Sequence, residues 1–446
     1  RVEVLPGISL TIEGSRNSSL VLSFVHADAS IFLHPGATLV VRNAAFYTPF
    51  RGWRHLDGVP YSERPPSITG VKSNGGATLV MENLICKGLW RCVDTRSGKA
   101  DHATITDSLF VDNHEAMKVD WWYSRSTTTG LWVTRSVFFS NVEGAQTDCH
   151  QSCSQCDCHL DQCLFLQNDV GIDCSIITSF VQVRSTTFAQ NEEALRSDEY
   201  NDRNDMHDML FYKNDVAYSG RFSGRGALGN VTFLENRIGM KLAFVPEGAL
   251  NRINFLGLGK EYHIHYTGAS LFDLNVSLTF WNTTSVDEIE EDIYDARDGS
   301  GQGLVRILAA ESMPETPFWH GMYQADSCAG QCGQSWFNTN WSSLISAGTG
   351  SFGFFDPDRS LHSGQVLHDA LLKGHEPPDG MSLSSYMQDL TNLLNAVSKF
   401  QTVGTSTSPL PSTTASTTTT TTTTTTLAQH LVVGADIIMT DPLWIT

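Results

Sequence analysis

Six segments of the chain share one pattern: a phenylalanine, an asparagine three residues later, and a small residue three further on. The phenylalanines lie 28, 27, 23, 23 and 22 residues apart, and they are Phe110, Phe138, Phe165, Phe188, Phe211 and Phe233. The asparagines are Asn113, Asn141, Asn168, Asn191, Asn214 and Asn236, and the small residues are Ala116, Gly144, Gly171, Ala194, Ala217 and Gly239. A repeat of this length predicts a solenoid, in which each repeat forms one coil.

Stacking explains why the same residue types recur at these positions. One coil cannot bury its inner face alone, so successive coils stack in parallel at about 4.8 Å and place equivalent residues above one another. We expect the phenylalanines to fill the interior and the asparagine amides to bond to the coils above and below. We also expect the asparagines to lie at a bend with left-handed backbone, which asparagine tolerates.

The pattern extends in both directions. Upstream, "GATLVVRNAA" and "GATLVMENLI" match each other and place Ala45 and Ile85 in the phenylalanine column. Downstream, Phe255 and Phe280 continue the column. The sequence therefore predicts an all-β fold, a parallel β-helix of about ten coils, with a small mixed C-terminal region that contains an amphipathic helix.

Two less generic stretches carry a resemblance to a known family. "VLPGISLTIEG" is similar to an opening coil, and "TFWNTTSVDEIEEDIYDARDGSGQGLVRI" is similar to a closing turn, acidic helix and last strand. Over residues 1–310 the chain resembles the right-handed parallel β-helix proteins of the pectin-lyase-like superfamily. Trp281 matches the family's tryptophan, and Asn282 stands where the family has glycine. The resemblance implies a right-handed solenoid.

Four regions follow from the pattern. Residues 1–310 form the β-helix, and residues 311–402 form a disulfide-pinned loop and helical cap region. Within that region one apolar stripe at helical spacing predicts the amphipathic helix: Leu383, Tyr386, Met387, Leu390, Leu394 and Val397. Residues 403–426 form a Ser/Thr/Pro-rich linker, and residues 427–446 form a strand segment.

Composition favours a secreted protein and disfavours nucleic-acid binding. The net charge is -19, with 29 Lys and Arg against 48 Asp and Glu, so the basic stripe of a nucleic-acid binder is not expected. No apolar run is long enough to span a membrane. Ten cysteines predict disulfides and an oxidising compartment, and they are Cys86, Cys92, Cys149, Cys153, Cys156, Cys158, Cys163, Cys174, Cys328 and Cys332. The alternative is a zinc site that includes Cys156 and Cys158, but the two separated pairs of a zinc ribbon are missing.

Glycosylation signals support the same compartment. N-glycans are predicted at the sequons Asn17, Asn230, Asn275, Asn282 and Asn340. O-glycans are predicted on the mucin-like tract Thr417, Thr418, Thr419, Thr420, Thr421, Thr422, Thr423, Thr424, Thr425 and Thr426. We expect a secreted glycoprotein, at the cell surface or in an extracellular appendage, with no resident cofactor.

The end of the chain predicts how units assemble. "HLVVGADIIMTDPLWIT" has strand patterning, and joined to "RVEVLPGISLTIEG" it is similar to the continuous entry of a β-helix. We expect this segment to complete the first coil of a neighbouring copy, in a separate chain or in one long polypeptide of repeated units, through Leu431, Val432, Val433, Ile437, Ile438 and Trp444. The alternative is that it caps the first coil of its own chain. Head-to-tail contacts that do not close generate filaments, so we expect a structural glycoprotein of an extracellular filament, hair or surface coat.

The competing hypothesis is a secreted carbohydrate-active protein, a polysaccharide lyase or hydrolase or a glycan-binding adhesin. Its catalytic candidates are the outward residues Lys118, Asp120, Asp148, Asp173, Arg196, Asp198, Arg221 and Lys241, and only this hypothesis would involve calcium. The motifs that mark polygalacturonases and pectate lyases are missing, so a solvated face is favoured. In "YHIHY", His263 and His265 are expected on one strand face, where a structural or surface role is favoured over a metal site.

Overall fold

The computed structural model describes residues 1–307 apart from short segments, and three stretches near the end of the chain, 429–431, 437–439 and 443–445. The segments left out are 15–19, 27–28, 49–66, 98–101, 122–128, 150–155, 175–179, 198–204, 222–226, 245–248, 251–252, 257–260, 269–272, 277–278, 282–284 and 300–302. Cys328, Cys332, the amphipathic helix, the threonine tract, and Val432 and Val433 lie outside the described residues.

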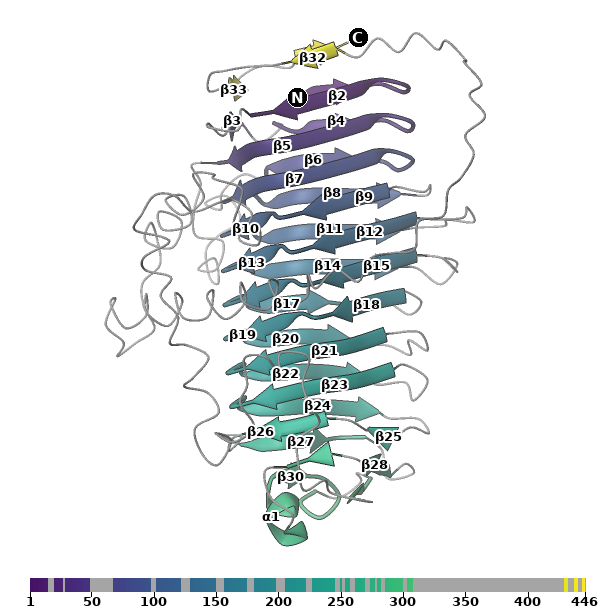
Figure 1. The fold of residues 1–446 in the computed structure, drawn as a ribbon, viewed down its shortest axis with the longest axis vertical. Coiled ribbons are helices and arrows are strands. Elements are labelled where there is room, and N and C mark those ends of the chain that lie inside the picture. The colour runs from purple at the N-terminus through teal and green to yellow at the C-terminus, as the bar shows by residue number, and fades with distance from the viewer. Residues whose placement is uncertain are drawn as a thin grey trace, which may run out of the picture.

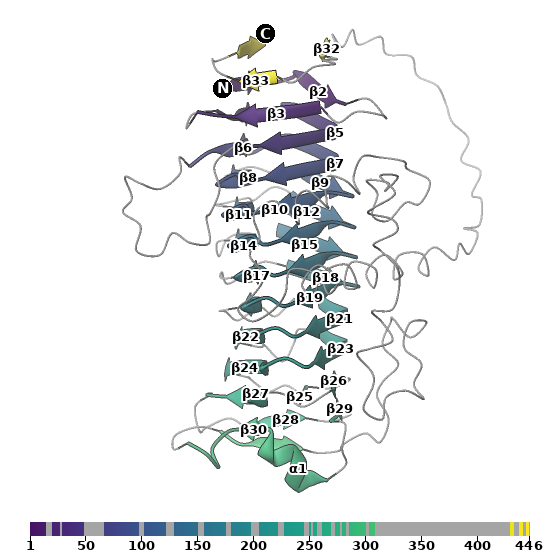
Figure 2. The same cartoon turned by 90° about the vertical axis from the view of Figure 1, so that its left-hand side faces the viewer.

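The chain folds as a parallel β-solenoid, so the predicted fold class is confirmed (Figures 1 and 2). Sheet A has 13 strands, in spatial order β30 (Ile293–Tyr294), β27 (Tyr262–Tyr266), β24 (Ile238–Phe244), β22 (Val216–Arg221), β20 (Glu193–Ser197), β17 (Val170–Asp173), β14 (Glu143–Cys149), β11 (Glu115–Trp121), β8 (Arg91–Ser97), β6 (Thr69–Ser73), β4 (Ile31–Leu33), β1 (Val2–Val4) and β34 (Leu443–Ile445). Each neighbouring pair is parallel, and all pairs come from successive coils except β1 with β34, which is from the end of the sequence.

Sheet B carries the other faces of the coils, and sheet C is a small sheet near one end of the solenoid (Figure 1). Sheet B contains β2 (Ser9–Glu13), β3 (Leu20–Phe24), β5 (Thr38–Tyr47), β7 (Thr78–Lys87), β9 (His102–Thr106), β10 (Leu109–Val111), β12 (Thr129–Thr134), β13 (Val137–Phe139), β15 (Cys156–Asp161), β16 (Leu164–Leu166), β18 (Phe180–Arg184), β19 (Thr187–Ala189), β21 (Asp205–Tyr212), β23 (Ala227–Leu234), β26 (Ile253–Leu256), β29 (Thr279–Phe280), β32 (Gln429–Leu431) and β33 (Ile437–Met439). Sheet C contains β25 (Ala249–Leu250), β28 (Leu274–Val276) and β31 (Val305–Ile307), and the helix α1 is Val286–Glu291.

The phenylalanine column forms the predicted stack in the core. From Phe110 to Phe255 the ring centroids of successive members lie 4.5–5.1 Å apart, and the rings are tilted by at most 18°. Trp281 extends the stack at 4.6 Å from Phe255. The predicted place of Phe280 in the column is wrong by one residue, because Phe280 pairs with Asn254. Such burial removes a large apolar area per coil from water and fixes the register of the coils.

The placement of Ala45 and Ile85 in this column is wrong by one residue. Phe46 pairs with Cys86, and Cys86 pairs with Phe110. The reason is a first left-handed corner in each coil, which lies three residues before the column: Asn43, Asn83 and Asp107 all have positive φ. The position of this left-handed corner determines which residue enters the phenylalanine column. The pattern of apolar residues after the corner does not determine it.

Cys86 and Cys92 form a disulfide in the core, as predicted. Cys86 occupies the phenylalanine column, and Cys92 follows Arg91 as Ala116 follows its register partner Glu115. Both cysteines have no exposed surface. In this coil, therefore, a covalent link joins the two positions that hold a phenylalanine and, six residues later, a small residue in other coils, as Phe138 and Gly144 do.

The asparagines form a continuous buried ladder of hydrogen bonds. Each Oδ1 from Asn141 to Asn236 accepts both the backbone N–H and the side-chain Nδ2 of the asparagine one coil earlier, at 2.9–3.0 Å. Each Nδ2 also donates to a carbonyl in the column of the phenylalanines, as Asn168 does to Phe138. The prediction that the amides link neighbouring coils is confirmed.

The expected left-handed backbone at the asparagines is wrong. The residue immediately before each asparagine takes this conformation, with φ between 53° and 55°, and these residues are Asp112, Ser140, Gln167, Gln190, Lys213 and Glu235. They are all polar, and Gln167 donates through Nε2 to Oε1 of Gln190 in the next coil. The asparagine is required for its amide, which satisfies backbone groups that the corner leaves unpaired.

Replacing Asn168 by alanine should destabilise the fold by about 3–5 kcal/mol, because Phe138 O and the Asn141 N–H would be buried without partners and each costs about 1–3 kcal/mol. Chemical denaturation of both proteins measures the difference. The matched control Gln182→Ala, on the half-exposed outer face of β18, should change stability by at most about 0.5 kcal/mol. Equal losses of stability in the two variants would show that the asparagine ladder stabilises the fold no more than a side chain on the outer face does.

Candidate functional site

Charged side chains gather in two columns on the outer face of sheet A, and we call them the charged face. The register of the strands places them on successive coils. The first column contains Arg91, Glu115, Glu143, Val170 and Glu193, so an apolar residue separates its last two glutamates. The second column contains Asp94, Lys118, Gln146, Asp173, Arg196, Ser219 and Lys241. Neighbouring coils are about 4.8 Å apart, so groups from different repeats are within reach of one another.

The structure brings four of the eight sequence-predicted catalytic candidates into the second column: Lys118, Asp173, Arg196 and Lys241. Asp120 and Asp148 are backbone partners on β11 and β14, and Arg221 ends β22. The side chains of these three residues, and all of Asp198, lie outside the described part of the chain.

Arg91 holds two carboxylates at one end of the charged face. Its Nε lies 2.7 Å from Glu115 Oε2, and its Nη1 lies 3.1 Å from Asp94 Oδ2. Burial alone would raise the pKa of Glu115, but hydrogen bonds with His114 and Arg91 outweigh it and lower this pKa to about 2. Glu115 is therefore ionised at all physiological pH values.

Arg196 makes a similar clamp two coils beyond Glu143. Its Nε donates to Glu193 Oε2 at 2.7 Å, and its Nη1 donates to Asp173 Oδ2 at 3.3 Å. Ser219 Oγ also donates to Glu193. Both arginines of the charged face are thus paired with carboxylates of this chain, which leaves less positive charge for an acidic polymer.

Glu143 lies between these two clamps and differs from its neighbours. Burial, reinforced by the negative charges of Glu115 and Asp173, raises the pKa of Glu143 to about 7. Its Oε2 is buried and has no hydrogen-bond partner among the described residues. A carboxyl that is half protonated near neutral pH beside one that stays ionised is the arrangement used for general acid and base roles.

Sequence reasoning missed Glu115, Glu143 and Glu193. The signal was present, because all three lie two residues after an asparagine of the ladder. Strict alternation along the strand instead predicts outward side chains five and seven residues after the asparagine, where Lys118 and Asp120 lie, and not two residues after it. The strand start departs from that alternation, because the small residue and the apolar residue after it both point inward, as Ala116 and Met117 do.

The same departure from strand alternation places the two histidines of "YHIHY" on different faces of the strand. His263 occupies the small-residue column, is 5% exposed and packs on Phe255, whereas His265 is half-buried on the outer face beside Tyr294. The expectation that both lie on one strand face is wrong. Burial lowers the pKa of His263 to about 4. Among the described residues, no group of three or more His, Cys, Asp or Glu side chains is placed to hold a metal ion.

The cysteine predictions are confirmed only in part. Cys86–Cys92 is the one disulfide between described residues. Cys163 carries a free buried thiol that donates to the carbonyls of Asp161 and Val133, so its predicted disulfide is wrong. It occupies a column in which Ser108, Ser136 and Thr186 make the equivalent bonds, and burial raises its pKa to about 12.

The remaining modification predictions are largely beyond the described residues. Cys158 and Cys174 are buried, and the described residues give no support to their predicted disulfides. The side chains of Cys149, Cys153 and Cys156 are outside the description. Of the five sequons, Asn275 is half-buried in β28, and the side chains of Asn17, Asn230, Asn282 and Asn340 are not described. N- and O-glycosylation stay predictions.

Comparisons with models of protein families, with curated proteins and with solved structures found no match for this chain. The parallel β-solenoid is therefore established by the structure alone. In the described part of the chain, no helix is long and apolar enough to cross a membrane.

Replacing Glu143 by glutamine should remove a pH dependence of stability. The native pKa of about 7 is above the unfolded value of 4.5, so the native state binds more protons and loses stability as pH rises through this window. The variant should therefore be more stable than the wild type at pH 8, by on the order of 2–3 kcal/mol, with a smaller difference at pH 5. Chemical denaturation at the two pH values measures this.

Glu193→Gln is the matched control in the same column. It removes an acceptor of Arg196 and Ser219, so it should lower stability at both pH values. If Glu143→Gln instead kept the pH slope of the wild type, Glu143 would not be the titrating group.

Proposed function

We propose that the chain is a structural glycoprotein module of an extracellular filament, hair or surface coat, whose units join end to end through β32, β33 and β34. The observation that carries this proposal is the pairing of these three strands with the first coil. β34 pairs with β1, β32 with β2 and β33 with β3, all in parallel. A segment far away in sequence therefore fits every strand of that coil.

In the single chain, the partner is its own first coil (Figure 1). Completion of a neighbour's first coil stays a prediction, and it uses the same backbone hydrogen bonds. An edge strand binds any chain that offers a matching strand, because main-chain groups supply the contacts. The same fit therefore serves closure within a chain and addition between chains.

The distance between the two ends of the solenoid is compatible with addition between chains. The described solenoid ends at β31, near α1, whereas β32 to β34 lie at the opposite end (Figures 1 and 2). With 13 strands in sheet A at about 4.8 Å per strand, the two ends of that sheet lie about 55–60 Å apart. A linker long enough to cross this distance to the first coil of its own chain is also long enough to reach the first coil of an adjacent copy.

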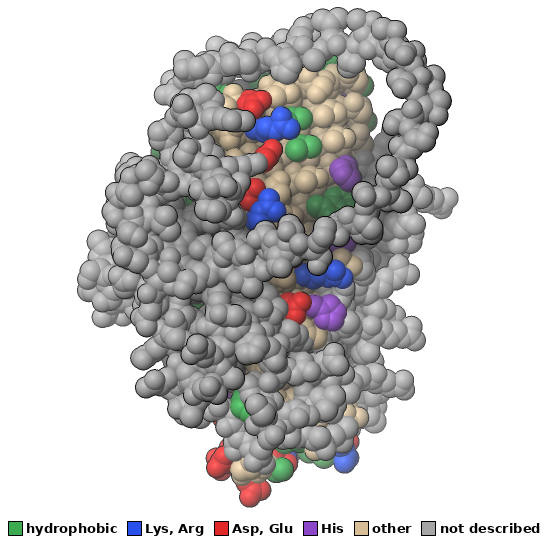
Figure 3. Space-filling model, viewed as in Figure 1, with side chains coloured by type: hydrophobic (Ala, Val, Ile, Leu, Met, Phe, Trp, Pro, Cys, Tyr) green, Lys and Arg blue, Asp and Glu red, His purple; other side chains and the backbone are tan. Residues whose placement is uncertain are grey.

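The solenoid is suited to a structural role because it resists stretching and bending. The asparagine ladder and the phenylalanine stack run through most coils, so stretching or bending the solenoid breaks many buried contacts at once. The described charges on the face shown in Figure 3 are interspersed in sign and form no basic patch. The charged face has both arginines paired internally.

Secretion, glycosylation and membership of the pectin-lyase-like superfamily complete the proposal. The buried Cys86–Cys92 disulfide agrees with an oxidising compartment. The sequons and the threonine tract would give the unit a protected surface and an extended tether. The repeat and the terminal motifs quoted above support a right-handed solenoid of that superfamily.

Assembly of the full chain tests the proposal. Wild-type protein should form end-to-end oligomers whose length grows with concentration, seen by electron microscopy and light scattering. Ile438→Pro with Leu443→Pro should give single units, because proline removes ladder donors in β33 and β34. The control Ser408→Pro, in the linker, should assemble normally. Single units at every concentration in the wild type would show that the segment only closes its own coil.

A carbohydrate-active role is the second candidate, and Glu143 is the observation that favours it. A neutral carboxyl at Glu143 and an ionised one at Glu115 could act as acid and base on a glycosidic bond. The expected result is release of sugars from extracellular polysaccharides, at a rate that falls at least about a hundredfold in Glu143→Gln. Gln182→Ala, on the outer face of β18 and away from the charged face, is the control. Turnover that is missing, or unchanged in Glu143→Gln, removes this candidate.

A further inference from the structure

The two ends of the solenoid differ in their ability to accept a strand. We propose that the first coil is the acceptor for the terminal strands of a second copy, and that the end with α1 is a terminator that accepts none. This inference rests on the proposed function and adds the polarity and the geometry of the joint.

At the first coil, all three strands offer a complete edge. On their inner side β1 pairs with β4, and β2 and β3 pair with β5. On the other side their described partners are β34, β32 and β33. The registers are continuous, with three residue pairs in each contact, such as Val2 with Leu443 and Val4 with Ile445. Without these partners, a full coil of backbone donors and acceptors would face solvent.

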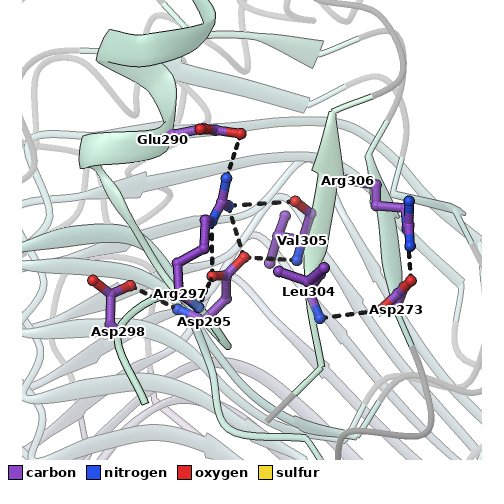
Figure 4. Close-up of polar contacts among 8 residues, drawn as sticks. All are labelled: Asp273, Glu290, Asp295, Arg297, Asp298, Leu304, Val305 and Arg306. Atoms are coloured by element: carbon purple, nitrogen blue, oxygen red, sulfur yellow. Dashed lines mark hydrogen bonds and ion pairs between the residues drawn. The ribbon is translucent and has the colours of Figure 1, made fainter. Parts of the chain in front are cut away.

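At the opposite end, an ion pair between the buried Asp295 and the exposed Arg297 occupies the edge of β31 (Figure 4). The Val305 N–H donates to Asp295 Oδ2 at 2.8 Å, and the Val305 carbonyl accepts from Arg297 Nη2 at 3.4 Å. Asp295 is completely buried and is held by Arg297 through Nε and Nη2. The pair thus takes both hydrogen bonds that an added strand would make with Val305. An incoming strand would have to displace it and leave a buried charge unpaired.

The helix α1 covers the same end and gives it a negative charge. Ile289 is buried beneath it, while Asp287, Glu288 and Glu291 are exposed and its last turn has no basic residue. Glu290 pairs with Arg297, which links the helix to the blocked edge (Figure 4).

These features determine the form of the assembly. Each unit has one donor segment and one acceptor coil, so the chain of units is unbranched and polar. The blocked end prevents coil-on-coil continuation from one unit to the next. Units are therefore tethered and articulated, and they do not form one uninterrupted solenoid.

Photo-crosslinking in the full-length protein tests this inference. A benzophenone-bearing phenylalanine analogue replaces Trp444, whose backbone lies beside Glu3. Isotopically light and heavy chains are mixed before assembly, and crosslinked peptides are identified by mass spectrometry. The same analogue at Val286, which is 51% exposed on α1, is the matched control for end stacking.

The expected result is crosslinks from position 444 to first-coil peptides of the other isotope, and no crosslinks from position 286 to a first coil. Crosslinks from 444 to α1 or β31 of another chain, or from 286 to another chain's first coil, overturn this inference while end-to-end assembly survives. Crosslinks from 444 that join only peptides of one isotope overturn both, because the joint would then be internal.

Discussion

The amide ladder is the interaction on which the rest of the structure depends. A parallel solenoid has a corner in every coil where the backbone leaves one sheet for the next, and each corner buries polar groups that neither sheet can pair. Here the side chain of one asparagine satisfies groups in the coils on both sides of it, so each coil needs its neighbours. Stacked amides also polarise one another, which strengthens the ladder beyond the sum of its bonds.

The ladder sets the position of every other column. The residue before each asparagine turns the chain with positive φ, and the residues after it enter sheet A with two inward side chains in succession. This local departure from alternation puts Glu143 outside and His263 inside, although simple counting gives a different answer. The same corner places Cys86 and Cys92 where a phenylalanine and a small residue would otherwise pack, so the disulfide replaces one layer of the stack.

Prediction from the sequence succeeded where one residue type has one physical reason to recur. The solenoid, the phenylalanine stack and the amide bonds followed from residues that repeat at fixed spacing. It failed where a position is defined by backbone conformation, as for Ala45, Ile85 and the left-handed corners. Cys163 was missed because a thiol can replace a hydroxyl as a hydrogen-bond donor, which composition does not reveal. The unusual pKa of Glu143 depends on which carboxylates stack beside it, and that requires the strand register.

An open edge at one end and a blocked edge at the other have different physical origins. Every solenoid has a last coil with an exposed backbone edge. The least costly way to pair that edge, in conformational entropy, is with a nearby group of the same chain. Asp295 and Arg297 do this with side chains only eight to ten residues from Val305, so the closure is local and forms together with the fold. The first coil has no such local terminator among the described residues, and its partners lie more than 400 residues away in sequence. The first coil is therefore completed by a segment from far along the sequence, and the same backbone hydrogen bonds form whether that segment belongs to the same chain or to another copy. Which of the two binds depends on protein concentration, because addition between copies is bimolecular and closure within a chain is not.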